Sequence, residues 1–173
     1  MTTATAPAAD PTKLPADAGY SPLEDRPLRG YAALVGIFGA SLAGGLAATR
    51  AAGRELPDRI PAGDLAITAL AVARVSRTAT RDIVTSWIRA PFMRFVEEAG
   101  HGEVEETARG TGMRRAVGEM LNCPYCFSQW VAGAFTVGWV ASPKLTRVLA
   151  GMWAAQTLAD VGNMAYAKLA EEV

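Results

Sequence analysis

Residues 31–49 read YAALVGIFGASLAGGLAAT, a run of 19 residues without a charged side chain. As an α-helix this run is roughly 28 Å long, close to the roughly 30 Å hydrocarbon core of a bilayer. A helix in the core of a soluble protein carries a polar stripe on one side, and this run has none. The run therefore predicts a transmembrane helix over about residues 30–50.

Three later segments extend this interpretation. Residues 123–142 form a second uncharged run, and residues 148–167 contain Asp160 as their one charged residue. A shorter apolar segment, 62–75, has Asp64 near its start and Arg74 near its end. The chain is thus predicted to be an all-α integral membrane bundle with four transmembrane helices, at about 30–50, 62–76, 123–142 and 146–168. Three spans remain if the short second segment does not cross.

The other segments are more polar. Residues 1–29, rich in Ala and Pro, predict a disordered tail before a helical membrane domain over 30–173. Residues 80–98 alternate apolar and polar positions at helical spacing, which predicts an amphipathic helix, split after Ala90 by Pro91. This helix lies either in the membrane interface or against the protein's own spans, and its proposed interfacial or partner-binding face is Arg81, Trp87, Arg89, Phe92, Arg94 and Phe95. Residues 100–118 read as a solvated loop running into a short helix.

Positive charge predicts the orientation of the spans. Counted from Arg74 at the end of the second span, the link to the third span contains eight arginines, against three in the link between the first and second spans and two basic residues after the third. The positive-inside rule therefore places the long link in the cytoplasm, together with both termini if there are four spans. The predicted location is the inner membrane.

Composition excludes several classes of function. The 173 residues carry a net charge of zero, and a general nucleic-acid binder needs a surplus of Lys and Arg. Two cysteines cannot build a disulfide-rich secreted scaffold, and one histidine, His101, leaves little room for histidine-based catalysis. We expect no nucleic-acid partner and no cofactor.

The most specific short motif is Cys123-Pro124-Tyr125-Cys126, at the start of the third predicted span. Two thiols at this spacing at a helix start suit a thiol–disulfide oxidoreductase. They also supply two of the four ligands of a zinc site, which His101 or a second copy of the chain would have to complete. The alternative is that both cysteines are small residues that shape the start of the helix.

Two patterns lie within the predicted spans. Gln156, Asp160 and Asn163 share one face of the fourth span, which predicts either a proton or ion pathway or hydrogen bonding between helices, with Asp160 protonated or paired to Arg74 or Gln129. Small residues recur at every fourth position of the first span, where another helix backbone can approach closely: Gly36, Ala40, Gly44 and Ala48.

Residues 64–166 resemble a family of small bacterial membrane proteins known as domain of unknown function 1360. The resemblance is carried by Arg77, Asp82, the string Arg89-Ala90-Pro91-Phe92, the Cys-Pro-Tyr-Cys motif and Trp130. It implies a membrane location and supplies no activity. We expect a non-enzymatic scaffold or adaptor that contacts membrane lipid and binds a protein partner or a second copy through its cytoplasmic link. The alternative is a membrane dithiol protein, redox-active or zinc-binding.

Overall fold

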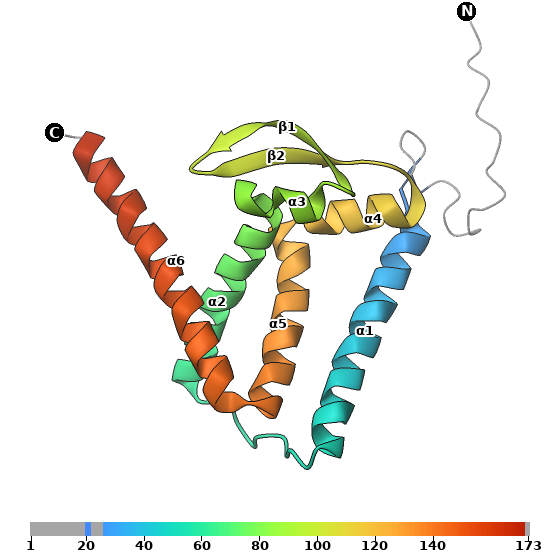
Figure 1. Cartoon of the computed structure of the whole chain (residues 1–173), viewed down its shortest axis with the longest axis vertical. Coiled ribbons are helices and arrows are strands. Elements are labelled where there is room, and N and C mark those ends of the chain that lie inside the picture. The colour runs from blue at the N-terminus through green and yellow to red at the C-terminus, as the bar shows by residue number, and fades with distance from the viewer. Residues whose placement is uncertain (1–19, 22–25, 172–173) are drawn as a thin grey trace, which may run out of the picture.

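The computed structural model describes residues 20–21 and 26–171. Four long helices run between the two ends of the molecule (Figure 1): α1 (Leu28–Ala51), α2 (Ala62–Arg81), α5 (Pro124–Ala141) and α6 (Pro143–Glu171). The remaining elements cross the end where α1 begins and α6 finishes: η2 (Ile83–Thr85), α3 (Ser86–Arg89), β1 (Met93–Gly100), β2 (Glu103–Ala108) and α4 (Gly112–Leu121). The prediction of a mostly helical chain is confirmed. The predicted tail, 1–29, lies largely outside the described residues.

The long helices match the four predicted helical segments, with different ends. Proline sets several of these ends, because it favours the first turn of a helix and cannot continue one. Pro61 precedes α2, Pro124 is the first residue of α5, and Pro143 opens α6 directly after the turn at Ser142. α2 has 20 residues, longer than the predicted 62–76, so as a helix it is about 30 Å long.

The prediction of one amphipathic helix over 80–98 is wrong. Helical structure ends at Arg89, just before Pro91 as predicted, but Met93–Gly100 and Glu103–Ala108 then form an antiparallel hairpin. Its two-residue loop is His101-Gly102, with φ of 52° and 76°. Positive φ at both loop residues is the geometry of a type I′ turn, which Gly102 adopts without strain. The loop predicted over 100–118 is therefore a strand in its first part, whereas its short helix is present as α4.

Small residues allow close packing of α2 against α6. Ala71, Ala150 and Ala154 are almost completely buried where these helices meet. The Thr157 hydroxyl donates a hydrogen bond across the contact to the Leu70 carbonyl at 3.0 Å. Short side chains bring the backbones close enough for such bonds.

α1 contacts the rest of the molecule mainly through α4 and α5. Phe38 meets Trp130 of α5 edge to face, with ring centroids 5.4 Å apart. A Cβ atom at Gly45 would lie 2.8 Å from Val137, whereas one at Gly36 or Gly44 would meet nothing within 4 Å. The predicted stripe of small residues therefore does not form the α1–α5 contact.

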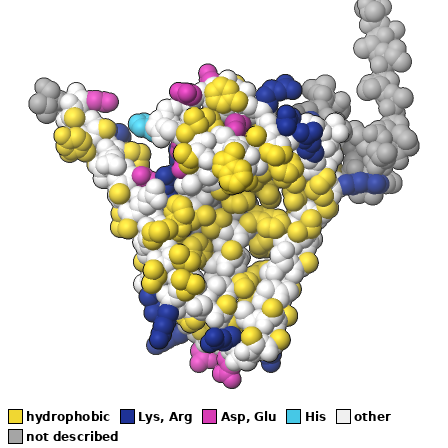
Figure 2. All heavy atoms as spheres, viewed as in Figure 1, with side chains coloured by type: hydrophobic (Ala, Val, Ile, Leu, Met, Phe, Trp, Pro, Cys, Tyr) yellow, Lys and Arg dark blue, Asp and Glu magenta, His cyan; other side chains and the backbone are white. Residues whose placement is uncertain are grey.

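Large apolar side chains remain exposed along the long helices. Val35 of α1, Leu65 of α2 and Val148 of α6 are each more than half exposed. In Figure 2 charged side chains gather toward the two ends, and hydrophobic ones cover the region between them. Among the described helices, α1 alone is long and apolar enough by composition to cross a membrane, and almost none of it is buried. α2, α5 and α6 do not meet this criterion of length and apolar composition.

Candidate functional site

The hairpin is held to the helices by ion pairs. Three arginines of α2 and α3 each pair with one glutamate of β2: Arg77 with Glu103, Arg81 with Glu105, and Arg89 with Glu106. The nitrogen–oxygen distances of these pairs are 2.5, 3.0 and 2.6 Å, respectively. The hairpin is therefore fixed along its β2 strand.

Arg89 is the centre of this attachment. Its side chain is fully buried, and the paired Glu106 side chain is 5% exposed. The remaining guanidinium nitrogens donate to two main-chain carbonyls and two hydroxyls: Ala79 O, Asp82 O, Thr85 Oγ1 and Ser86 Oγ. A buried charge needs this degree of pairing and hydrogen bonding. Arg89 thus joins α2, η2, α3 and β2, and its predicted place on an exposed face is wrong.

The same end of the molecule exposes apolar side chains. Trp87 is 76% exposed although it lies two residues from the buried Arg89. Phe95 of β1 is also exposed, as is the basic Arg94, whereas Phe92 is half-buried. We define the hairpin-end apolar surface as the exposed apolar residues of η2, α3 and β1: Ile83, Val84, Trp87, Ile88, Phe95 and Val96. Four of these residues lie on η2 and α3, next to the buried Arg89, and two lie on β1, which pairs with the ion-paired strand β2.

The polar residues of α6 do not act as a group. Asp160 pairs with Arg74 of α2 at 3.3 Å, and Arg74 also reaches Asp82 at 3.2 Å. Arg74, one of the two predicted partners of Asp160, is therefore its observed partner, and the other, Gln129, is not. Gln156 and Asn163 are exposed. The arrangement is an ion pair between two helices, and the described residues outline no polar pathway.

The two cysteines lie at the start of α5. Cys123 is the N-cap residue, and its sulfur accepts a hydrogen bond from the Cys126 amide at 3.2 Å. Both thiols are free. His101 lies at the hairpin turn, and no group of three metal-binding side chains occurs among the described residues. The two thiols therefore lie together at a helix start, and the described residues supply no third ligand for a metal ion beside them.

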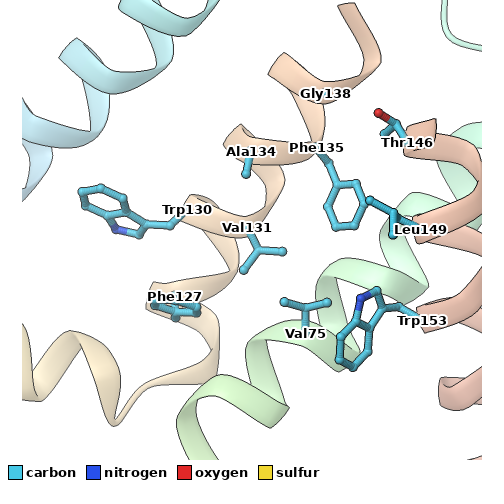
Figure 3. Close-up of a pocket in the computed structure, with 10 residues that line it drawn as sticks. All are labelled: Val75, Phe127, Trp130, Val131, Ala134, Phe135, Gly138, Thr146, Leu149 and Trp153. Carbon is cyan, nitrogen blue, oxygen red and sulfur yellow. The ribbon is translucent and has the colours of Figure 1, made fainter. Parts of the chain in front are cut away.

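Sequence analysis missed an apolar cavity between α2, α5 and α6. It has a volume of about 460 Å³ and is open to the outside. Figure 3 shows Phe127, Phe135 and Trp153 among the side chains that line it. The pocket contains no charged side chain, so it suits an apolar ligand and offers no groups for acid–base chemistry.

The glutamates of β2 are the other residues that the sequence did not reveal. Glu103, Glu105 and Glu106 lie in a charged stretch that reads as solvated loop. The available signal was the Gly-His-Gly string at 100–102, since a two-residue loop ending in Gly is typical of a hairpin. Their arginine partners lie 17 to 26 residues away, which no local pattern reports.

Comparison with known proteins gives two matches. Residues 67–166 match the family described as Protein of unknown function (DUF1360), which confirms the resemblance found over 64–166. The Sporulation protein YjcA of Bacillus subtilis (strain 168) is 28% identical over 111 residues, covering 62% of this chain and 94% of that protein. No solved structure matches. The family region includes both hairpin strands, Arg89 and the two cysteines.

Proposed function

The chain belongs to the family described as Protein of unknown function (DUF1360), and we propose for it a non-enzymatic role as a multi-pass membrane scaffold. Four helices cross the inner membrane, and the hairpin end faces the cytoplasm. The hairpin-end apolar surface binds a protein partner there. The relative from Bacillus subtilis is named as a sporulation protein.

Exposure and length support the four membrane crossings. Many large apolar side chains of α6 are exposed and almost none of α1 is buried, an arrangement that is costly in water but not in lipid. α5 carries no charged residue, and α2 has the roughly 30 Å needed to cross. The charges on α2 are paired: Asp64 accepts from Arg147 at 2.8 Å near one end, and Arg74 contacts two carboxylates near the other.

The arrangement of the chain supports the orientation. The start of α1, the end of α6 and the hairpin lie at one end of the molecule (Figure 1). The α1–α2 loop and the α5–α6 turn lie at the other. The arginine-rich link belongs to the hairpin end. Positive-inside orientation then puts that end and both termini in the cytoplasm.

The observation that carries the scaffold role is the contrast between Trp87 and Arg89. A fully buried arginine network fixes the backbone of α3, and that same helix holds a tryptophan 76% exposed. Exposed aromatic residues on a rigid support are typical of the energetic centre of protein interfaces. No set of side chains in the described residues combines a nucleophile, a base and an oxyanion site.

In-cell photocrosslinking tests this role. A benzoylphenylalanine at Trp87 is expected to crosslink to one defined protein, identified by mass spectrometry. The same probe at Leu56, an exposed residue of the α1–α2 loop at the opposite end, is the control. Trp87→Ala should weaken co-purification of that protein. Crosslinks from Trp87 to lipid alone, or the same products from Leu56, would contradict the scaffold role.

A membrane dithiol protein is the second candidate. The observation in its favour is the pair of free thiols at the start of α5, where the Cys126 amide donates a hydrogen bond to the Cys123 sulfur. Labelling with permeant and impermeant maleimides, with and without reductant, is the test for redox activity. Zinc content of the wild type and of Cys123→Ser/Cys126→Ser is the test for metal. Thiols that stay reduced and metal-free would eliminate this candidate.

A further inference from the structure

Two arginines converge on one backbone oxygen at the hairpin end. The Pro91 carbonyl accepts from Arg109 Nε at 3.2 Å and from Arg114 Nε and Nη2 at 2.9 and 2.6 Å. Gly110, with φ of 85°, makes room for this arrangement, because a Cβ there would lie 2.8 Å from Arg114 Cδ. The two guanidinium groups are thus held close together by one shared acceptor.

This pair lacks a carboxylate within the described part of the chain. Three arginines at the same end, Arg77, Arg81 and Arg89, each pair with a glutamate of β2. Arg109 and Arg114 are instead exposed, and the three bonds to Pro91 leave both Nη atoms of Arg109 and Nη1 of Arg114 without a protein acceptor there. Two like charges held close together repel each other, and a bound anion relieves the repulsion.

The position of the pair relative to α1 identifies the anion. Gly30 of α1 packs against α4, since a Cβ there would lie 3.3 Å from the Gly112 carbonyl oxygen and 3.5 Å from the Met113 Cα. The uncharged run of α1 begins at the next residue, 31. The segment that carries Arg109 and Arg114 therefore lies level with the first turn of the span. In a bilayer that level is occupied by lipid headgroups.

We propose that Arg109 and Arg114 bind the phosphate of an anionic phospholipid of the cytoplasmic leaflet, whose acyl chains lie along the exposed surface of α1. This inference rests on the proposed crossing of the membrane by α1. Guanidinium groups donate paired hydrogen bonds to phosphate oxygens. The lipid adds to the contact that α1 already makes with α4.

Native mass spectrometry of the full chain in mild detergent tests the proposal. The protein is titrated with phosphatidylglycerol and with phosphatidylcholine of identical acyl chains, and inorganic phosphate serves as the soluble competitor. Arg109→Gln/Arg114→Gln removes the site. Arg54→Gln/Arg59→Gln makes the same charge change on exposed residues of the α1–α2 loop, at the opposite end of the molecule.

The wild type is expected to prefer phosphatidylglycerol, and Arg109→Gln/Arg114→Gln to lose roughly twentyfold to thirtyfold in its binding, about fivefold per arginine. The loop variant should keep the preference. Equal loss in both variants, no loss in either, or displacement of the lipid by inorganic phosphate at matching concentration would overturn the proposal. Extraction of the chain from membranes without detergent would instead refute the proposed membrane function itself. Failure of the lipid site and failure of the membrane function are therefore distinguishable.

Discussion

Replacing Arg89 by methionine is expected to release the hairpin from the helices. Methionine keeps an apolar stem of similar length but removes every donor that Arg89 supplies to Glu106, two carbonyls and two hydroxyls. Removing one partner of a buried ion pair costs about 3–5 kcal/mol, because the other charge stays buried and unpaired. The Glu106 side chain, 5% exposed, is in that position.

Hydrogen exchange of the amides of β1 and β2, followed by mass spectrometry, measures this loss directly. A cost of about 3–5 kcal/mol corresponds to roughly two to almost four orders of magnitude in protection, where exchange reports the opening equilibrium. Arg81→Met is the matched control. Its pair with Glu105 is far more exposed, at 24% and 49%, so its loss should cost about 1 kcal/mol or less.

A double variant separates the buried charge from the lost hydrogen bonds. Arg89→Met/Glu106→Gln removes both charges, so it should be less destabilised than Arg89→Met by about 1–3 kcal/mol, as is usual for groups within one network. Protection in Arg89→Met equal to that in Arg81→Met would refute the reasoning. So would a double variant that is less stable than the single one.

Three further predictions concern stability in a fixed detergent, followed by the thermal unfolding midpoint. Gly118→Ala should cost about 1–3 kcal/mol, because its Cβ would lie 2.7 Å from a backbone carbonyl oxygen. The control Gly44→Ala has open space around it and should be neutral or stabilising by up to about 1 kcal/mol. Equal effects of the two substitutions would refute the close packing around Gly118. Arg147→Gln should destabilise more than Arg147→Gln/Asp64→Asn, because the single change leaves the largely buried Asp64 carboxylate unpaired; a double variant that is worse than the single one would contradict this. Cys123→Ala should lose about 0.5–2 kcal/mol with the helix cap, whereas Cys123→Ser should stay close to wild type; equal losses would show that the cap contributes nothing.

The long helices could be predicted from the sequence because their signal is local. Uncharged runs and the prolines at 61, 124 and 143 fix where these helices lie and end. Arg74 was one of the two partners predicted for Asp160, beside a protonated Asp160 and a proton or ion pathway, and choosing among these requires knowing that α2 packs against α6. Sequence analysis therefore found the helices and named candidate partners, but not the packing that selects among them.

The hairpin could not be predicted because its stability is tertiary. Its strands contain glutamate at five positions, a residue that strands disfavour. Pairing with arginines of α2 and α3 compensates for three of these glutamates. The same distant pairing buries Arg89, which at helical spacing looks like a member of an exposed basic face. Local propensity gave the wrong structure where long-range ion pairs decide it.

In the proposed membrane orientation, the hairpin end and the α1–α2 loop lie on opposite sides of the membrane. Single cysteines at His101 and at Glu55, introduced into a Cys123→Ser/Cys126→Ser background, report the two ends when spheroplasts are treated with an impermeant maleimide. We expect Glu55→Cys to be labelled in intact spheroplasts and His101→Cys only after lysis. Labelling of both from the same side would contradict the account.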